Sequence, residues 1–441
     1  MYANVMKKTN HRATAMILTV ILLVTFGLAG SGAALAADAQ PQLNLEATSA
    51  ILIEASNGQV LYEMNADTPF PPASMAKMMT EYLVLEAISN GKINWDTVVT
   101  TSANASKVIG SGSLLAPGEQ LTVRDMFADL SIYSGNRSAV ALAEHLAGSE
   151  EDFANLMNQT ARKMGLSEQA HFINATGLSR ADMGENAPKT IEGETLLSAR
   201  DAAMLAYHLL KDHPEVLEFT SIPTWRLRPT DKEVMTNYNW MLEGWKSEAE
   251  TNNIGTSLKS YWYEGVDGLK TGYTQEAMYC FTGTAKRGDI RLISVVMGTQ
   301  SQSKRFQETR KLLDYGFNNF EMREVVAAGS EVEGLPTVPV KKGAKTKVPV
   351  VTQSSLSILV RKDVKDEDII KSAAPIDESS IVAPIKEGDV LGTLTVTYNG
   401  HSYDVPLVAK EDVNKANWFK LLLRSIGEFF SNLFKSIKNL F

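Results

Sequence analysis

Strand-forming segments at both ends of one region, with helical segments between them, restrict this chain to few folds. Residues 49–64 carry two apolar-rich strands around Asn57-Gly58, a pair that accepts the positive φ angles of a tight hairpin turn. From about residue 269, "LKTGYT", "MYCFTGTAKR" and "RLISVVMG" predict three more strands, and "RFQETRKLLDYGFNNF" predicts a closing helix. We therefore expect an α/β (α+β) fold in which both ends of the region build one sheet layer. Mostly helical segments lie between the two ends, including 139–146, 152–164 and 199–211.

The composition changes after about residue 323, where prolines separate short β-branched runs such as "KVPVV", "LSILV" and "GTLTVTY". This pattern predicts a small all-β domain. A chain of 441 residues also exceeds what one hydrophobic core usually holds. We therefore expect a larger domain at residues 37–323 and a β-rich domain at residues 324–409.

The first 36 residues have the features of an export signal. Lys7, Lys8 and Arg12 form a charged start, residues 13–30 are uncharged and mostly apolar, and Ala34-Leu35-Ala36 offers the small residues of a cleavage site. We expect residues 1–36 to be a signal peptide. An uncleaved N-terminal membrane anchor is the alternative.

The C-terminal residues 410–441 predict an amphipathic helix. Its charges recur too often for a segment that spans a bilayer, whereas a helix lying in the interface of an anionic membrane has this pattern. Packing of its apolar face on the protein itself or on a partner is the alternative. The apolar stripe contains Phe419, Leu422, Leu423, Ile426, Phe429, Phe430, Leu433, Phe434, Ile437, Leu440 and Phe441. The opposite side carries Lys420, Arg424, Glu428, Ser431, Lys435 and Lys438, with Leu421 as an exception.

Charge and composition argue against several classes of protein. A formal net charge of -8 argues against a nucleic-acid binder, because phosphate contacts need clustered basic residues. The single cysteine, Cys280, allows no internal disulfide, and its apolar neighbours predict a buried core residue rather than a nucleophile. The histidines show neither metal-ligand spacing nor the setting of a histidine-based triad. Those after the leader are His145, His171, His208, His213 and His401.

The pattern Ser-x-x-Lys occurs three times, and its context separates the three matches. Ser89/Lys92 lies in a helix-ending turn, and Ser301/Lys304 lies in a polar connector. Ser74/Lys77 follows two prolines and opens a segment whose apolar residues recur at helical spacing. Ser74/Lys77 is therefore the match best placed for chemistry.

A serine hydroxyl becomes a good nucleophile only when a neighbouring base takes its proton. Residues i and i+3 share one face of a helix, so the Lys77 amine can reach the Ser74 hydroxyl. Lysine acts as a base only when neutral, and burial, a second cation and a helix N-terminus all lower its pKa. Taken alone, Ser74/Lys77 is still more often a solvated pair on a helix surface.

Two further sequence elements change that balance. Ser134-Gly135-Asn136 precedes a helical run, and Lys270-Thr271-Gly272 lies on a predicted strand. S-x-x-K, S-D-N and K-T-G, in this order, are the signature of penicillin-binding proteins and class A β-lactamases. Ser102-Ala103-Asn104 competes for the middle position, and we prefer Ser134 because it stands at the start of a helix.

On these elements the chain resembles the serine D-alanyl-D-alanine carboxypeptidases, low-molecular-mass penicillin-binding proteins, of the type found in Bacillus-like Gram-positive bacteria. The resemblance extends through "ASMAKMMT", "SGN", "FINATGL", "SARDAAMLA", "VDGLKTGYT" and "LISVVMG", and covers the β-rich domain and the amphipathic tail. The stretch "GNRSA" departs from the commoner "GNDA"-type continuation. The resemblance implies a penicillin-binding-protein/β-lactamase-like catalytic domain with an antiparallel sheet and a helical subdomain.

The resemblance also implies an acyl-transfer mechanism. Ser74 would attack the penultimate D-Ala carbonyl of a peptidoglycan stem peptide, and Lys77 would take its proton. Ser134 would relay a proton toward the leaving amine, and Asn136 would hold the substrate backbone and orient Lys77. Water would then hydrolyse the acyl-enzyme.

The strand Lys270-Thr271-Gly272-Tyr273 would bind the substrate. Lys270 would supply positive charge and Thr271 a hydroxyl near the terminal carboxylate. The backbone N–H groups of Ser74 and Tyr273 would form the oxyanion hole. Arg305 is a candidate second partner of the carboxylate, and a surface arginine on a helix is the alternative.

The implied partners are peptidoglycan stem peptides, β-lactam antibiotics that acylate the same serine, and an anionic membrane surface. No metal or organic cofactor is implied. The enzyme would act at the outer face of the cytoplasmic membrane, facing the cell wall, and removal of the terminal D-Ala would limit cross-linking.

Three alternatives share parts of this pattern. A serine β-lactamase uses the same serine and lysine, although the Glu-centred deacylation motif is not evident in this sequence. A transpeptidase or endopeptidase of the same fold differs only in its acceptor or substrate bond. A protein that only binds the cell wall would need Ser74 or Lys77 out of place.

Overall fold

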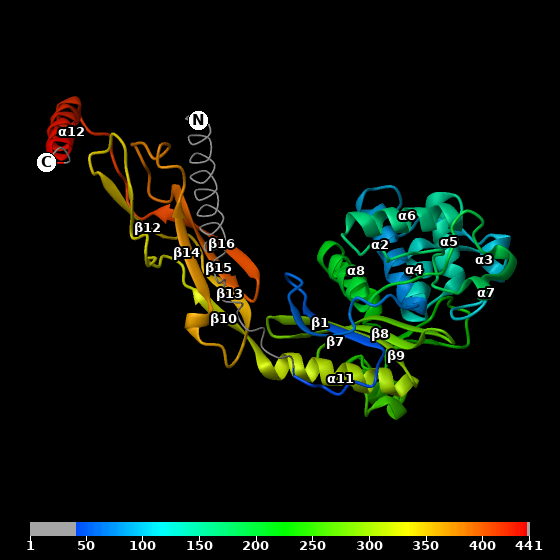
Figure 1. The fold of residues 1–441 in the computed structure, drawn as a ribbon. Helices are drawn as coiled ribbons and strands as arrows, with labels where there is room; N and C mark the ends of the chain where they lie inside the picture. Colours follow the sequence, from blue (N-terminus) through cyan, green and yellow to red (C-terminus); the bar gives the residue numbers. More distant parts are fainter. Residues whose placement is uncertain (1–40, 439–441) are drawn as a thin grey trace, which may run out of the picture. The chain divides into compact units, whose positions relative to one another are not determined.

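The computed structural model describes residues 41–438. The predicted signal peptide, residues 1–36, lies outside them. In the described part, strands and helices alternate first, and a strand-rich portion follows (Figure 1).

A five-stranded antiparallel sheet has the strand order β2-β1-β9-β8-β7. The hairpin is formed by β1 (Ser49–Glu54) and β2 (Val60–Met64), and β7 (Val266–Thr274), β8 (Met278–Arg287) and β9 (Ile290–Thr299) follow far along the chain. Pairing of β1 with β9 joins the two ends of the region in one sheet, which confirms the predicted construction. Gly58 adopts φ 78° in the hairpin turn, as the Asn-Gly pair predicts.

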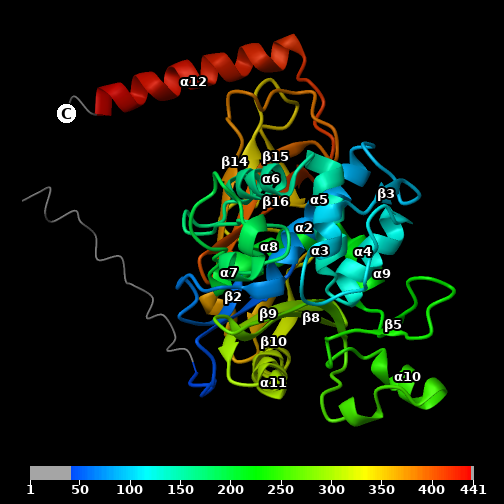
Figure 2. The same cartoon turned by 90° about the vertical axis from the view of Figure 1, so that its right-hand side faces the viewer.

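Helices cover both faces of this sheet (Figures 1 and 2). The closing helix α11 (Gln302–Asn319) packs on one face, and α2 (Lys77–Ser89) and α8 (Ala199–Asp212) pack on the other. The predicted helical insertion is present between β2 and β7. Its further helices are α3 (Ala103–Lys107), α4 (Val123–Ile132), α5 (Asn136–Ala147), α6 (Glu150–Lys163), α7 (Arg180–Met183), α9 (Leu217–Thr220) and α10 (Trp245–Asn252). Its short strands are β3 (Val98–Thr100), β4 (Gln120–Thr122), β5 (Thr224–Trp225) and β6 (Met235–Thr236).

The C-terminal strands form a separate hydrophobic core, as their β-branched composition predicts. β10 (Phe320–Val326) pairs with β13 (Leu356–Arg361), so β10 runs across residue 323, where the sequence places a domain boundary. A five-stranded sheet has the order β11-β12-β16-β15-β14. Its strands are β11 (Thr337–Pro339), β12 (Lys347–Thr352), β14 (Ile370–Pro375), β15 (Val390–Tyr398) and β16 (His401–Ala409).

The last helix, α12 (Trp418–Lys438), lies within the segment predicted to be amphipathic. Six residues of the predicted stripe are exposed: Phe419, Leu422, Leu423, Ile426, Phe429 and Phe430. The remaining members of the stripe, from residue 433 onward, lie outside the described side chains. None of the helices described is both long and apolar enough to cross a membrane.

Candidate active site

Ser74 and Lys77 lie together where a short 3₁₀ helix, η1 (Ala73–Ala76), runs directly into α2. The Lys77 Nζ atom lies 2.8 Å from Ser74 Oγ and donates a second hydrogen bond to the Thr176 carbonyl at 2.9 Å. The Lys77 side chain is 0% exposed, whereas Ser74 is partly exposed. The amine and the hydroxyl therefore face each other at hydrogen-bonding distance, with the serine open to a ligand.

Burial of the neighbouring apolar residues fixes this arrangement. Met75, Met78 and Met79 are buried and anchor the start of α2 in the main hydrophobic core. Ala73, directly before the serine, adopts φ 47°, in a left-handed region that non-glycine residues seldom occupy. The turn that presents Ser74 is therefore held in place by its surroundings rather than by local preference.

The electrostatic environment of Lys77 favours a neutral amine. Burial lowers the pKa of Lys77 well below its usual value, and the positive charge of Lys270 lowers it further. The acidic side chains of Glu81, Asp129 and Glu150 act in the opposite direction. A neutral amine is the form that can accept the proton of Ser74.

Ser134 and Asn136 lie at the turn between α4 and α5. Ser134 has a φ of 58° and its Oγ atom accepts a hydrogen bond from Lys270 Nζ at 2.8 Å. The Asn136 amide nitrogen donates to the Ile109 carbonyl at 2.7 Å, and its Oδ1 atom is buried without a hydrogen-bond partner among the described residues. The resemblance implies that Asn136 orients Lys77, and the structure shows the Thr176 carbonyl as a hydrogen-bond partner of the Lys77 amine.

Lys270, Thr271 and Gly272 lie on β7, at the edge of the sheet. Lys270 is 3% exposed, and burial lowers the pKa of its amine, while Glu81 acts to raise it. A Cβ atom on Gly272 would stand 2.4 Å from the Pro72 carbonyl oxygen, so only glycine lets β7 approach the segment before Ser74 this closely. Tyr273, next along the strand, is 53% exposed.

Arg305, on α11, is buried at 3% exposure, so the alternative of a surface arginine is wrong. Its guanidinium donates to the Gly272 carbonyl at 3.2 Å, and its Nε atom has no hydrogen-bond partner among the residues described. Burial lowers the pKa of Arg305 to about 10. The side chain thus places a cation behind the segment of β7 that carries Lys270.

The competing sequence matches have other roles. Ser102 caps α3, and Asn104 donates to Glu144 at 2.8 Å. Ser301 caps α11 by accepting a hydrogen bond from the Lys304 backbone N–H at 3.1 Å. Gly91, with φ 69°, terminates α2 between Ser89 and Lys92. These pairs lie outside the cluster around Ser74.

Cys280 is buried, and burial raises the pKa of its thiol to about 12. A thiol with so high a pKa carries little thiolate at neutral pH and is a poor nucleophile. The prediction of a buried core cysteine is confirmed.

Comparison with known families decides the identity of this fold. The family model described as D-alanyl-D-alanine carboxypeptidase matches residues 35–301, and the model described as penicillin-binding protein 5, C-terminal domain, matches residues 320–415. The chain belongs to the D-alanyl-D-alanine carboxypeptidase family. It therefore has the penicillin-binding-protein fold that the sequence elements predict.

Individual relatives agree with this family. The carboxypeptidase-family chain is 37% identical over 389 residues to the D-alanyl-D-alanine carboxypeptidase DacF of Bacillus subtilis, covering 88% of this chain and 91% of DacF. It is similar to the solved structure of the peptidoglycan synthesis regulatory factor PBP3 of Streptococcus pneumoniae, with a TM-score of 0.70 and 30% identity. The match covers 84% of this chain and 100% of the Streptococcus chain. A second solved structure, penicillin-binding protein D2 of Listeria monocytogenes in the cefotaxime bound form, has a TM-score of 0.50 and 34% identity. This match covers 63% of the present chain and 100% of the Listeria chain.

Sequence reasoning missed the Thr176 carbonyl at the candidate site of this carboxypeptidase-family chain. A backbone acceptor leaves no side-chain signal, although "FINATGL" includes the residue. The next residue, Gly177, has φ 79°, and a Cβ atom there would stand 1.9 Å from the Ala73 carbonyl oxygen. The glycine therefore lets the 176–177 loop close over the start of η1.

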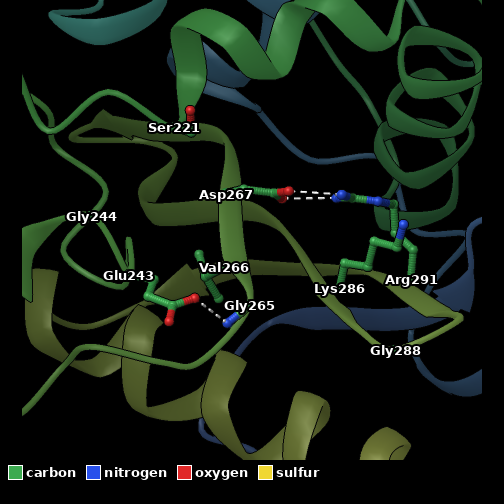
Figure 3. Close-up of a pocket in the computed structure, with 9 residues that line it drawn as sticks. All are labelled: Ser221, Glu243, Gly244, Gly265, Val266, Asp267, Lys286, Gly288 and Arg291. Carbon is green, nitrogen blue, oxygen red and sulfur yellow. Dashed lines mark hydrogen bonds and ion pairs between the residues drawn. The ribbon is translucent and has the colours of Figure 1, made fainter.

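A pocket of about 650 Å³ opens at the start of β7 (Figure 3). Arg291 donates to both carboxylate oxygens of Asp267, at 2.8 and 2.7 Å, and Glu243 accepts from the Gly265 backbone N–H at 3.0 Å. None of the nine residues that line it was predicted for the active site. These bonds secure the beginning of the strand whose later residues carry Lys270.

Proposed function

We propose that this chain removes the terminal D-Ala from peptidoglycan stem pentapeptides ending in D-Ala-D-Ala, through an acyl-enzyme on Ser74. The observation that carries the proposal is the 2.8 Å separation of Lys77 Nζ and Ser74 Oγ, with Lys77 fully buried. A buried amine next to a hydroxyl can act as its general base at neutral pH. Membership of the carboxypeptidase family supports the same reaction.

In the proposed first step, neutral Lys77 takes the Ser74 proton while Oγ attacks the carbonyl carbon of the penultimate D-Ala. The backbone N–H groups of Ser74 and Tyr273 would stabilise the oxyanion of the tetrahedral intermediate. When that intermediate collapses, the C–N bond breaks, Ser134 relays the proton held by Lys77 to the leaving amine, and the terminal D-Ala departs. The Ser134 hydroxyl accepts a hydrogen bond from Lys270 at 2.8 Å, and this contact orients it in the site.

Positive charge would hold the carboxylate at the end of the peptide. Lys270 is the principal cation, and Thr271 supplies a hydroxyl beside it. Arg305 adds positive charge behind β7, where it donates to Gly272. The unpartnered Oδ1 atom of Asn136 suits an N–H group of the peptide backbone. Water then hydrolyses the ester on Ser74 and restores the enzyme.

Mass spectrometry of a pentapeptide ending in D-Ala-D-Ala tests the reaction. We expect the native protein to remove one alanine and the Ser74→Ala variant to leave the peptide intact. Intact peptide in both samples would contradict the proposal. Joining of two peptides in place of hydrolysis would identify a transpeptidase instead.

We also propose that β-lactams acylate Ser74 and leave slowly. The structure of the Listeria relative in the cefotaxime bound form supports this expectation. Intact-mass measurement should find one penicillin added to the native protein and none added to Ser74→Ala. Rapid turnover of penicillin without a lasting adduct would favour a β-lactamase.

We propose further that the protein is exported and that α12 lies on the outer face of the cytoplasmic membrane. The exposed apolar residues of α12 support this, because so many large groups on one helix form an unusual surface for a soluble protein. Lys420 donates to Ala344 and Arg424 donates to Gly343 and Ala344, so part of the basic face is engaged by backbone carbonyls. The apolar face would enter the lipid.

Flotation with vesicles tests the membrane contact. The native protein should float with vesicles containing anionic lipid, and the double variant Phe429→Glu/Phe430→Glu should remain at the bottom. Val390→Glu, at an exposed apolar residue of β15, is the matched control and should float like the native protein. Equal flotation of all three proteins would contradict the contact. N-terminal sequencing of the protein from the producing cell should begin at Ala37 if the signal peptide is removed.

A further inference from the structure

Glu81 is a buried acid that the proposed mechanism does not use. It lies on α2 one helical turn after Lys77, it is 0% exposed, and neither carboxylate oxygen has a hydrogen-bond partner among the described residues. The hydroxyl of Ser131, on α4, faces it and also lacks a partner at hydrogen-bonding geometry. Burying an unpaired carboxylate costs several kcal/mol or more in general, so a nearby charge must offset the cost.

The charged groups around Glu81 come from several packed elements. Lys77 precedes it on α2, and Lys270 faces it from β7, which packs against α2. Asp129 on α4 and Glu150 at the start of α6 act on Lys77, and Arg305 on α11 acts on Lys270. Glu81 therefore lies in a group of two buried amines with further charges at its edge.

Glu81 differs from the other two acids because they are already hydrogen-bonded. Asp129 accepts from the Ser138 hydroxyl at 2.6 Å and from the Ser113 backbone N–H at 3.0 Å. Glu150 accepts from the Ala175 backbone N–H at 3.1 Å. Burial raises the pKa of the Glu81 carboxyl to about 7, and Lys270, the facing Ser131 hydroxyl and Lys77 act to lower it.

Charge balance then determines how many protons the two amines hold. In a site of low dielectric constant, one carboxylate is balanced by one ammonium ion, and a second ammonium ion would be costly. The proposed reaction needs this distribution, with a neutral amine at Lys77 and a cation at Lys270. Of the two amines, Lys270 exerts the larger stabilising effect on the Glu81 carboxylate.

We propose that Glu81 is the buried counter-charge that keeps one ammonium ion, on Lys270, in the site while Lys77 remains neutral. Glu81 is thus a positioning residue that acts through the two lysines and does not touch the substrate. The inference rests on the proposed function, because only acyl transfer by Ser74 requires the two amines to differ in charge.

The pH profile of kcat/KM for D-Ala release tests this role. Its acidic limb reports loss of the Lys77 proton, and its alkaline limb reports loss of the Lys270 proton. Glu81→Gln keeps the shape of the side chain and removes its charge, so the pKa of both amines should fall. We expect both limbs to move to lower pH, by about one unit or more. Acylation by fluorescent penicillin provides a second readout of the acidic limb.

Two control variants separate charge from packing. Glu81→Asp keeps a carboxylate and should leave both limbs close to their native positions. Glu54→Gln changes another buried acid, at the end of β1, which bonds to Ser56 and Asn57. It should lower the free energy of unfolding without moving either limb. Unmoved limbs in Glu81→Gln, with or without a uniform loss of activity, would overturn the inference.

A measurement on the native protein keeps the inference testable if Glu81→Gln does not fold. In protein labelled with ¹³C at lysine and glutamate side chains, the Glu81 carboxyl should be ionised at pH 8. Lys77 and Lys270 should lose their protons at different pH values, so that only one of them is charged at pH 8. A protonated Glu81, or two amines charged together at this pH, would overturn the inference. A native protein that neither releases D-Ala nor reacts with penicillin would overturn the proposed function as well, whereas native activity with unmoved limbs overturns this inference alone.

Discussion

Ser74/Lys77 and Ser301/Lys304 have the same spacing and each opens a helix, yet they do different work. Lys77 is fully buried beside the Ser74 hydroxyl and the Thr176 carbonyl. Lys304 turns away from Ser301 and pairs with Glu46 at 2.6 Å near the surface. Ser301 uses its hydroxyl to cap α11.

The pKa values of the two lysines are shifted in opposite directions. Burial and Lys270 lower the pKa of Lys77, whereas the hydrogen bond with Glu46 raises the pKa of Lys304. The surroundings of Lys77 therefore favour a neutral amine, and those of Lys304 favour a charged one. The Ser-x-x-Lys spacing brings the two residues close together on a helix. The surroundings decide whether the lysine amine is neutral enough to accept a proton from the serine.

The largest difference between the pairs should come from replacing each lysine with arginine. Lys77→Arg introduces a cation that does not lose its proton, so acylation by penicillin should slow by about 10² to 10⁴-fold, the range of general-base contributions. Lys304→Arg keeps its ion pair with Glu46 and should acylate at the native rate. Stopped-flow measurement with a fluorescent penicillin compares the two, and equal rates in both variants would remove the distinction.

A change at Lys270 sharpens the comparison by testing a third lysine, on a strand. Lys270→Gln removes a charge that would bind the substrate carboxylate, and such charged hydrogen bonds contribute about 1.5–3 kcal/mol. We expect kcat/KM for D-Ala release to fall by about 10 to 100-fold, mainly through a higher KM. Steady-state kinetics measures the split between kcat and KM. A fall confined to kcat would argue against carboxylate binding by Lys270.

The pH dependence of acylation distinguishes the pairs in the native protein. Because the pKa of Lys77 lies well below that of an ordinary lysine, the acylation rate should rise with pH and reach a plateau below pH 10.5. Lys304→Arg should not move this profile, since Lys304 stays protonated throughout. A rate that keeps rising to pH 10.5 would mean that Lys77 titrates like a lysine in water.

The smallest effect should be found at Ser301. Ser301→Ala removes the cap of α11 and should lower the free energy of unfolding by about 1 kcal/mol, while penicillin acylation is retained. Urea unfolding measures the change. Ser260→Ala, at an exposed serine outside any helix cap, is the matched control and should be neutral. A loss of acylation in Ser301→Ala would show that the second pair is coupled to the site.

Local patterns predicted the parts of this molecule that depend on neighbouring residues. The hairpin around Asn57-Gly58 and the strands β7 to β9 follow from turn chemistry and apolar runs. The proximity of Ser74 and Lys77 follows from helix geometry. The contact of Lys270 with Ser134 joins residues 136 positions apart, and the resemblance to a family led to it rather than any local rule.

Burial from several sides limited what the sequence could predict. α2 is enclosed between the sheet and other helices, so even Lys77 and Glu81 are buried on it. The sequence also predicted the helix that carries Arg305. Nothing in the neighbouring residues indicates that the Arg305 guanidinium is buried against β7. Charged residues of this kind become visible only when the packing partners of the helix are known.

The glycine at position 272 links the distance between two functional groups to backbone contact alone. A Cβ atom at this position would lie 2.4 Å from the Pro72 oxygen, so the turn that carries Ser74 and the strand that carries Lys270 approach each other without an intervening side chain on residue 272. Direct backbone contact therefore sets the separation of these two segments. Side chains around Ser74 and Lys270 can therefore change in a relative, while the approach of these two backbone segments is retained as long as residue 272 has no side chain.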